Sequence, residues 1–571
     1  MRLENLRSER ARYGFLFIIL ACGIFASHLR DGYLSDDFLY VAWARRSLAT
    51  LLAHLTISSY PQVLRPLPAL AWLLSRLAAG PLWLHVLALA VHGANSGFLF
   101  AISRKWGAAR STAFILGFLF LVFPLSGEVV LWLSSGFDLW AAFFALLAVT
   151  ALQKEKGIGL GLLFYALALL CKESALCLPL VLLLLFSRLR WRIVPFLLTA
   201  GLYLAARFAL FGGIGGYKDH FGRTVVTQFH PGAFLRALAV QVPVRILAPV
   251  PVESRLAFGG MIVLSLILLC GFGASGFRPR KALLAAAGVF VAAILPAAPL
   301  LRVEWDLQGA RLLYLPLALA LVALARFTCP PTRIATVSGT VLAGYWMIAA
   351  VLNGSHWSTA SQEVRQTLNT MKAFHSRFPA GATILVDAPD TYQGAYVFRN
   401  GLSEAAELAG LRRDLHWRRG TVALLGPGTR RDLGVRVFEI GVDGDWTACE
   451  RSLFTLPRQG TPLSLVPASA QSWVSIPVTI AETGCHSVTL STSCGENTGT
   501  LFWKTTGAAP FTTMRSRDLK LSGESLPVRL SSLGSPSKLW LRIDLDRPMA
   551  AACWGPVELG RCPVSCSSLR R

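Results

Sequence analysis

Charged residues are scarce in this chain, and their scarcity excludes most classes of soluble protein. Only 15% of the 571 residues are Asp, Glu, Lys or Arg, whereas 54% are hydrophobic. A soluble globular protein carries roughly a quarter charged residues, so this composition indicates a protein with many membrane spans. Acidic residues are scarcer than basic ones: the chain has 31 Asp and Glu but 55 Lys and Arg, which gives a net charge of +24.

The positive charge does not indicate binding to nucleic acid. Lys and Arg fall in short clusters between apolar runs, a pattern typical of loops that orient membrane helices. The chain has no Walker motif, no pair of CxxC motifs and no clear short repeat, heptad or low-complexity tract. Disulfides are therefore a better interpretation than zinc for the six cysteines of the polar C-terminal part, which are Cys449, Cys485, Cys494, Cys553, Cys562 and Cys566.

Long apolar runs dominate the first 352 residues and predict about eleven helices, although several runs are shorter than the roughly 20 residues that a span needs. The runs cover about 14–28, 82–102, 111–125, 136–152, 158–171, 174–187, 193–211, 256–274, 282–301, 311–327 and 334–352. The first run is read as an uncleaved span, because no convincing small-residue cleavage site precedes soluble sequence.

The loops between these runs alternate in charge. With a cytoplasmic N-terminus, every second loop is basic, and the acidic residues collect in the other loops. The basic loops hold Arg104, Lys105, Arg110, Lys154, Lys156, Arg188, Arg190, Arg192, Arg278, Arg280, Lys281, Arg326 and Arg333. The acidic loops hold Asp36, Asp37, Glu128, Glu173, Asp219, Glu304 and Asp306. We therefore expect a bacterial inner-membrane protein whose C-terminal part is extracytoplasmic.

Three regions follow from these patterns. Residues 1–352 form the membrane domain, 353–460 a small α/β region with a helix from Gln362 to Phe378, and 461–571 a β-sandwich of the jelly-roll type. Within the sandwich, Trp473, Phe502, Trp503 and Trp540 either fill the core or stack on sugars, and the core is the preferred interpretation.

The two long loops expected on the outer side contain candidate functional stretches. Ser35-Asp36-Asp37 places two adjacent carboxylates just after the first apolar run, where charge is costly and usually functional, unless the pair caps a helix. The same loop contains Leu48–Ile57 and Pro66–Leu77, which read as interfacial or re-entrant helices. A later loop opens with the run Gly212–Gly216, which either cradles phosphate or is a flexible loop.

Residues 13–350 resemble the GT-C glycosyltransferases, in particular the protein O-mannosyltransferase and TMTC-type branch. Six elements match in chain order: Ser35-Asp36-Asp37; Arg65-Pro66-Leu67; His85, His92 and Asn95; the segment Phe123 to Asp138 with Glu128; Lys172-Glu173; and Arg311-Leu312-Leu313-Tyr314-Leu315-Pro316. Three positions depart from the family pattern, namely Phe123 for His, Phe137 for Arg and Ala310 for Glu, and no tetratricopeptide array follows.

The resemblance implies transfer of a hexose or pentose from a polyprenyl-phosphate carrier to an acceptor, usually with inversion. Asp36 or Asp37 is then the general base, with Asp36 slightly favoured. The leaving phosphate needs cations, for which Arg65, Lys172, Arg207 and Arg311 are candidates. Glu128, Glu173 and Tyr314 complete the expected substrate-binding set. No metal site or certain cofactor is expected, and a divalent metal beside the acidic pair stays open.

Each of these residues also has a non-catalytic interpretation. The four cations could instead be interface residues whose charged ends extend to water. Lys172 and Glu173 could form a local charge pair, and Glu128 and Asp138 could be structural hydrogen-bond partners. The acceptor is a protein hydroxyl, a glycan or a lipid, with lipid or cell-wall polysaccharide modification as the rival within the same superfamily. A transporter or flippase is the alternative from a different class of protein. Transporters tend to place their polar sites near the membrane midplane and often have repeated halves, whereas the acidic residues here lie at helix ends on one face and no halves repeat. The third alternative is a non-catalytic membrane protein that displays the C-terminal β domain.

Overall fold

The structure is a computed structural model of the chain. It describes residues 2–56, 62–76, 80–154, 157–186, 191–216, 224, 229–252, 254–277, 279–377, 383–420, 436–442, 463–466, 471–480, 485–492, 497–504, 516–521, 525–529, 537–549 and 554–561. Contacts divide the chain into two units. The helical unit comprises residues 1–362 and 391–396, and the C-terminal unit comprises 363–390 and 397–571.

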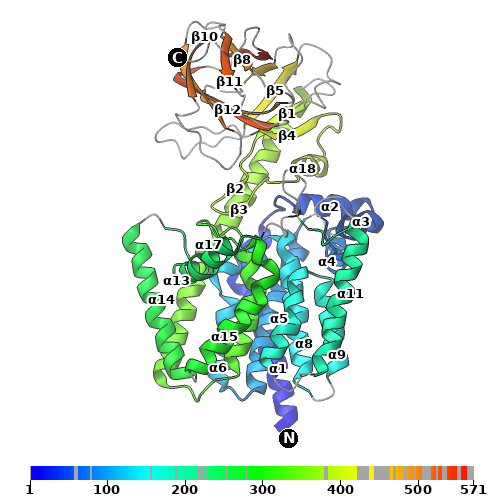
Figure 1. The fold of residues 1–571 in the computed structure, drawn as a ribbon, viewed down its shortest axis with the longest axis vertical. Coiled ribbons are helices and arrows are strands. Elements are labelled where there is room, and N and C mark those ends of the chain that lie inside the picture. The colour runs from blue at the N-terminus through cyan, green and yellow to red at the C-terminus, as the bar shows by residue number, and fades with distance from the viewer. Residues whose placement is uncertain are drawn as a thin grey trace. The chain divides into compact units, whose positions relative to one another are not determined.

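Helices make up the first unit (Figure 1). They are α1 Arg2–Ile24, α2 Asp37–Arg46, α3 Leu48–Thr56, α4 Pro66–Trp72, α5 Leu82–Lys105, α6 Arg110–Leu121, α7 Gly127–Val130, α8 Gly136–Leu152, α9 Ile158–Leu169, α10 Leu178–Leu185, α11 Val194–Phe211, α12 Pro231–Arg236, α13 Val242–Leu247, α14 Arg255–Gly276, α15 Pro279–Ile294, α16 Tyr314–Ala325 and α17 Arg333–Phe374. A helix satisfies every backbone hydrogen bond within one segment, which lipid requires.

Among the described residues, six helices are long and apolar enough to cross a membrane: α5, α8 with its preceding turn, α11, α14, α15 and α17. A seventh results if α6 and Pro124–Val130, which meet at 41°, count as one span. The expected runs at 158–171, 174–187 and 311–327 contain shorter apolar helices, and the run at 14–28 covers the second half of α1 and part of the 3₁₀ turn Ala26–Arg30. A total of eleven spans stays a prediction.

Small residues allow the central helices to approach closely. An added Cβ at Gly93 of α5 would lie 2.5 Å from the Ile18 Cα of α1, and one at Gly97 would lie 2.9 Å from the Gly14 Cα. Such spacing lets two backbones touch, which is the usual basis of helix association in lipid. By contrast, α14 lies at the edge of the unit in Figure 1 and exposes large apolar side chains such as Leu256 and Ile267, as expected for a helix that faces lipid.

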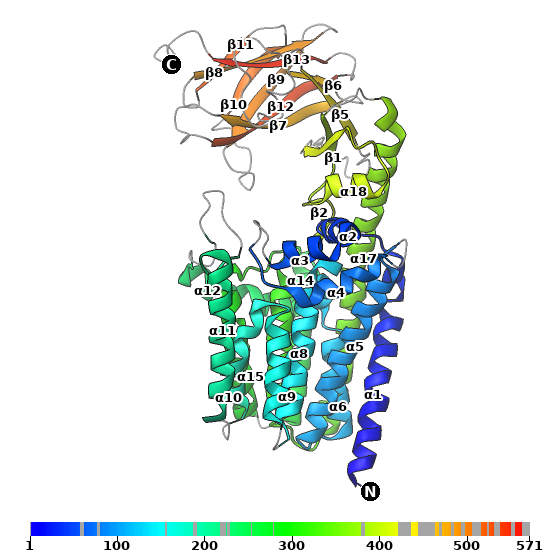
Figure 2. The same ribbon diagram turned by 90° about the vertical axis from the view of Figure 1, so that its right-hand side faces the viewer.

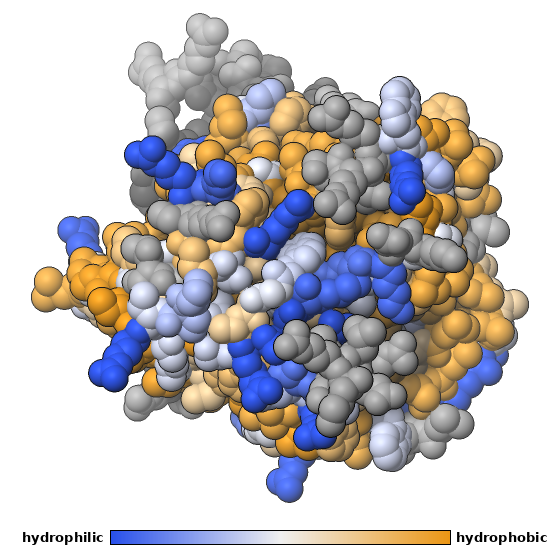
Figure 3. All heavy atoms as spheres, turned by 90° about the horizontal axis from the view of Figure 1, so that it is seen from below, coloured by the Kyte–Doolittle hydropathy of each residue, from blue (hydrophilic) through white to orange (hydrophobic). Residues whose placement is uncertain are grey.

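The two ends of the helical unit differ. Figures 1 and 2 show the N-terminus and the α5–α6 and α8–α9 turns at one end, and α2, α3 and α4 at the other. Figure 3, which looks at the N-terminal end, shows hydrophilic side chains across the middle of the face and apolar ones on its flanks. Here Glu9 pairs with Arg104 and Arg110. The basic residues Lys156, Arg188, Arg190 and Arg278 lie outside the described residues.

The loop between the first two apolar runs contains three helices. The two expected ones are present as α3 and as α4 with the 3₁₀ turn Leu73–Arg76, and α2, which begins at Asp37, agrees with the alternative that the acidic pair starts a helix, although Asp36 makes no side-chain capping bond. A difference concerns the boundary expected after Leu352. The helix α17 passes this point and runs without a break from Arg333 to Phe374, 42 residues in all, so the last apolar run and the helix predicted from Gln362 form one helix.

The C-terminal unit contains α18 Leu402–Leu408 and strands in two sheets. The strands outside the helical unit are β1 Thr383–Asp387, β4 His416–Gly420, β5 Arg436–Val442, β6 Leu463–Val466, β7 Gln471–Ile480, β8 Cys485–Thr492, β9 Asn497–Lys504, β10 Ser516–Leu521, β11 Ser525–Arg529, β12 Ser537–Met549 and β13 Trp554–Arg561. One sheet runs β11-β8-β13-β6-β5-β1-β4 and the other β10-β9-β12-β7.

Strand pairing in this unit is antiparallel except between β1 and β4. Parallel pairing needs a crossover, and α18 lies in the segment that joins these two strands. The predicted sandwich packing, the predicted disulfides and the role of the four aromatic residues depend on side chains outside the described set. They stay predictions.

Candidate active site

Residues 128–138 are the segment on which the expected site residues converge. Pro124 interrupts the helical run after α6, because proline lacks the N–H that would continue it. The chain then forms α7 and a 3₁₀ turn, Leu133–Ser135, before α8 begins. This irregular backbone presents five side chains to other loops: Glu128, Trp132, Ser134, Phe137 and Asp138. We call it the hub segment.

Asp37 is the carboxylate that the fold holds most firmly. It is 1% exposed, and it accepts hydrogen bonds from the Leu34 N–H (3.0 Å), the Ser134 N–H (2.8 Å) and the Ser134 hydroxyl. Burial raises the pKa of Asp37 to about 7, and these hydrogen bonds oppose the rise. Ser35, with φ of 45°, turns the chain into this position. Asp37 therefore anchors the acidic pair to the hub segment.

Asp36 differs from its neighbour. It is the N-cap residue of α2 but makes no side-chain capping bond, and its side chain is only partly buried. Adjacent residues point in different directions at a helix start, so the buried position of Asp37 leaves Asp36 nearer to solvent. Of the two expected bases, Asp36 is the more exposed one.

Arg65 and Glu173 form a two-point ion pair. Arg65 Nε donates to Glu173 Oε2 at 3.1 Å, and Arg65 Nη2 donates to Oε1. The guanidinium lies 5.3 Å from the ring centre of Phe137, at the position where the resemblance has an arginine. The close ion-pair partner of Glu173 is thus Arg65, whereas Lys172 acts on Glu173 only through its nearby charge. A bidentate Arg–carboxylate contact fixes the guanidinium plane.

Arg207 approaches the same carboxylate from α11. Its Nη1 lies 4.0 Å from Glu173 Oε2, while Nε donates to the Ile214 carbonyl at 2.8 Å and Nη1 to the Tyr203 hydroxyl at 3.3 Å. An added Cβ at Gly215, whose φ is +73°, would lie 3.2 Å from Arg207 Nη2. The end of the glycine run, Ile214 and Gly215, therefore packs against Arg207, and the predicted role of the run as a phosphate cradle stays a prediction.

Lys172 joins the hub segment through Asp138. The two form an ion pair in which Asp138 is 3% and Lys172 is 8% exposed. Burial lowers the pKa of Lys172, Asp138 opposes this effect, and the nearby charges of Arg65 and Arg311 add to it. The charges of three separate loops are therefore close enough to act on one another.

Glu128 and Arg311 form the third ion pair at the hub segment. Glu128 Oε2 accepts from the Arg311 backbone N–H at 3.0 Å, and Oε1 lies 3.4 Å from Arg311 Nη1. The Arg311 guanidinium also stacks on Trp132, whose indole N–H donates to the Leu34 carbonyl at 3.4 Å. Trp132 thereby connects Arg311 with the loop that carries Asp36 and Asp37.

Tyr314 does not share this environment. It is 1% exposed, and its hydroxyl contacts His92 Nδ1 at 2.8 Å and Asn95 Nδ2 at 3.2 Å. His92 also bonds to the Leu121 carbonyl at 2.9 Å. These contacts connect α5, α6 and α16 inside the bundle. These contacts show polar packing between helices around Tyr314, and its expected substrate-binding role stays a prediction.

Sequence reasoning missed other polar contacts. Ser134, which binds Asp37, lies in the matched segment but was given no role. His28, Asp31 and Ser358 form a buried cluster, with His28 Nδ1 2.8 Å from Asp31 Oδ2 and Ser358 donating to the same oxygen at 2.9 Å. This cluster connects the start of the acidic loop to α17. No sequence signal pairs residues 330 positions apart.

The described residues contain no group of three His, Cys, Asp or Glu side chains arranged to hold a metal ion. They do contain an apolar groove between α4, α5 and α8, lined by residues that include Pro68, Trp72, Leu84, Phe137 and Trp140. Because Phe137 also contacts Arg65, this groove borders the cationic side of the site. No family model and no curated protein matches the chain.

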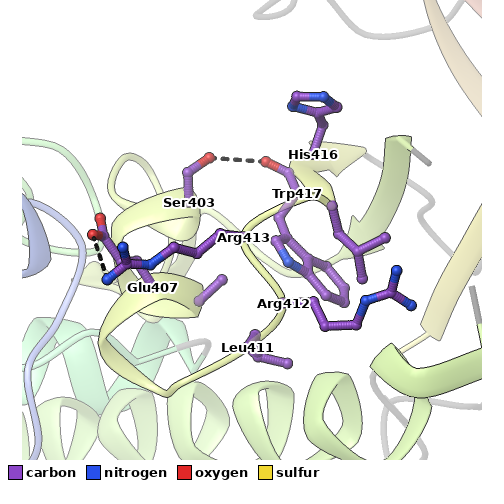
Figure 4. Close-up of a pocket in the computed structure, with 9 residues that line it drawn as sticks. Ser403, Glu407, Leu411, Arg412, Arg413, His416 and Trp417 are labelled. Atoms are coloured by element: carbon purple, nitrogen blue, oxygen red, sulfur yellow. Dashed lines mark hydrogen bonds and ion pairs between the residues drawn. The ribbon is translucent and has the colours of Figure 1, made fainter. Parts of the chain in front are cut away.

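A hollow of about 470 Å³ lies in the C-terminal unit beside α18 and β4 (Figure 4). Ser403 donates to the Trp417 carbonyl at 3.0 Å, and Arg413 lies 3.9 Å from Glu407. Arg412 pairs with Asp414 and lowers its pKa. The hollow includes none of the expected site residues and shares no residue with the hub segment.

Proposed function

We propose that the chain is a membrane glycosyltransferase that moves a hexose or pentose from a polyprenyl-phosphate donor to an extracytoplasmic acceptor. The observation that carries the proposal is the pairing of four cations with three carboxylates: Arg65 and Arg207 contact Glu173, whereas Lys172 and Arg311 contact Asp138 and Glu128 of the hub segment. Each cation has at least one ion-pair partner, so these are organised side chains and differ from cations that merely extend toward an interface.

The leaving group explains why such cations are needed. When the bond between the sugar and the phosphate breaks, negative charge grows on the phosphate oxygen, and fixed cations in a buried site stabilise it. Arg65 is fixed by Glu173 and Arg311 by Glu128, so neither must reorganise during the reaction. The apolar side chains beside Phe137, among them Pro68, Trp72 and Leu84, give this side of the site an apolar surface, although the space between them is only about 30 Å³.

The acceptor hydroxyl needs a base. In this proposal Asp36 removes its proton while the oxygen attacks the anomeric carbon, and the bond to the phosphate oxygen breaks as the new glycosidic bond forms. A positioned carboxylate in this role contributes roughly 10²–10⁴ in rate. Asp37 is already occupied by Leu34 and Ser134 and acts as the anchor of the pair. A divalent metal beside Asp36 is the alternative arrangement within the same proposal.

The acceptor is a protein hydroxyl, a glycan or a lipid, and lipid or cell-wall polysaccharide modification belongs to the same proposal. We place the protein in a bacterial inner membrane, with a cytoplasmic N-terminus and an extracytoplasmic C-terminal unit. The basic loops near the N-terminus and the acidic residues at the opposite end support this orientation. A reporter fused after Asn353 tests it.

The activity test uses the full chain in nanodiscs with a panel of polyprenyl-phosphate sugars and a membrane extract as the acceptor source. Mass spectrometry follows release of polyprenyl phosphate by wild type, Asp36→Asn and the control Glu304→Gln, which changes a carboxylate outside the hub contacts. We expect release from one donor, a loss of about 100-fold or more in Asp36→Asn, and a wild-type rate in the control. Full activity in Asp36→Asn would remove this residue from the mechanism, and transport of an intact lipid without release would indicate a flippase.

A further inference from the structure

A short hairpin outside the apolar helices belongs to the helical unit. Strands β2 Thr391–Tyr392 and β3 Ala395–Tyr396 pair antiparallel, with Tyr392 opposite Ala395. The turn residues Gln393 and Gly394 both have positive φ, 45° and 84°, which is the signature of the two-residue type I′ turn. The contacts of residues 391–396 group them with residues 1–362 and separate them from their neighbours in sequence.

Close backbone contact holds the hairpin tip. An added Cβ at Gly394 would lie 1.9 Å from the carbonyl oxygen of Asp306, so the tip lies directly on the loop that leads to Arg311. The His356 side chain hydrogen-bonds to the backbone of Gln393, and its ring lies edge-on to Tyr392 with a centroid distance of 6.3 Å. Two elements of the helical unit therefore fix the tip.

The last residue of the hairpin reaches the hub segment. Tyr396 is 3% exposed, its ring centre lies 4.2 Å from that of Trp132, and its hydroxyl donates to Glu128 Oε1 at 3.3 Å. The same carboxylate binds the backbone and the guanidinium of Arg311. Trp132 contacts both Tyr396 and Arg311. These four side chains form one closed set of contacts.

We propose that Tyr396 is a positioning residue that holds Arg311 in place for the donor phosphate. This role rests on the proposed function. The terminal torsion of a glutamate is broad, so a carboxylate with one fewer partner samples more orientations. An arginine whose carboxylate partner moves loses its fixed plane and holds a phosphate less well. The Tyr396 hydroxyl restricts Glu128, and Glu128 in turn restricts Arg311. The hairpin thereby supplies a residue that acts on a site built by the membrane helices.

The test measures binding without requiring turnover. Full-length protein in nanodiscs is titrated with farnesyl phosphate, and separately with farnesol, which lacks the phosphate; native mass spectrometry gives both affinities. Tyr396→Phe removes one hydroxyl and keeps the ring on Trp132. Tyr392→Phe removes the other tyrosine hydroxyl of the hairpin and is the matched control. We expect Tyr396→Phe to weaken farnesyl phosphate binding about tenfold and to leave farnesol binding and the control unchanged.

A second variant tests the route of the effect. Because Tyr396 acts through Glu128, adding Tyr396→Phe to Glu128→Gln should weaken binding much less than Tyr396→Phe does alone. Equal losses for farnesyl phosphate and farnesol, or wild-type affinity in Tyr396→Phe, would overturn the positioning role and leave the proposed function standing. Wild-type protein that binds farnesol but not farnesyl phosphate would overturn the proposed donor class together with this role.

Discussion

Replacing Asp37 by asparagine should damage the fold more than the chemistry. One carboxylate oxygen of Asp37 accepts from the Leu34 N–H and the other from the Ser134 N–H and hydroxyl. An asparagine has only one acceptor oxygen. Whichever way its amide is turned, its NH₂ group faces one of the two backbone N–H groups, so one buried donor loses its acceptor.

The cost follows from burial. A buried donor left without an acceptor costs about 1–3 kcal/mol, and the side chain is 1% exposed, so water does not replace the lost partner. Asp36→Asn changes a neighbouring carboxylate that is only partly buried and makes no capping bond, so it should alter stability by less than about 0.5 kcal/mol. The two variants change the same charge at adjacent positions and should separate stability from catalysis.

The assay is thermal unfolding in one detergent at one scan rate, followed by tryptophan fluorescence, because membrane proteins often unfold irreversibly. Asp37→Asn should lower the midpoint by several degrees, and Asp36→Asn should not. Rates are then compared well below both midpoints. The reasoning is refuted if Asp37→Asn unfolds with the wild-type midpoint, because the three hydrogen bonds would then contribute nothing measurable.

Four further outcomes follow. Because burial raises the pKa of Asp37 to about 7 from an ordinary 3.8, the folded chain keeps a proton that the unfolded chain releases; raising the pH through this window should therefore lower wild-type stability, with a smaller slope in Asp37→Asn. Lys172→Met leaves Asp138 as a buried charge and should cost about 3–5 kcal/mol, part of which Asp138→Asn restores in the double variant; a wild-type unfolding midpoint for Lys172→Met would contradict the pair. Gly394→Ala should increase proteolysis at the hairpin, whereas Gly410→Ala, with similar φ but open space around it, should not. Tyr314→Phe should lower the free energy of unfolding by about 1–3 kcal/mol, seen as a lower unfolding midpoint, without changing the affinity for farnesyl phosphate. A weaker affinity for farnesyl phosphate would indicate that Tyr314 contributes to donor binding.

Periodicity and charge predicted the parts of the fold that depend on local sequence. Apolar runs located the helices, because lipid leaves the backbone few alternatives, and the described elements between residues 461 and 571 are strands, as predicted for that region. The helix α2 was expected only as an alternative, because its polar start, Asp36-Asp37, also resembles an acidic loop motif. The end of the last span was placed too early, because polarity rises after Leu352 while the helix continues. A helix that leaves the membrane keeps its hydrogen bonds, so a change in hydropathy does not end it.

In the candidate site, too, the sequence predicted which residues belong together but not which side chains pair. The resemblance selected residues whose side chains do meet at the hub segment, but partners had to come from the structure. Lys172 pairs with Asp138 across 34 positions, and Arg65 pairs with Glu173 across 108. Tyr314, which lies in the same matched element as Arg311, turned out to face His92. Tyr396 had only a weak signal, a Gln-Gly turn between short polar strands, and its contact with Glu128 joins residues 268 positions apart.

The hairpin has a consequence for biosynthesis. Residues 391–396 are synthesised after every apolar helix, and they must reach Glu128 and Asp306 before the helical unit has all of its contacts. A chain shortened to the apolar helices therefore lacks part of its own packing, and the helices are not a module that can be transplanted by cutting after the last span. Final assembly waits for sequence that emerges from the ribosome well behind the membrane helices.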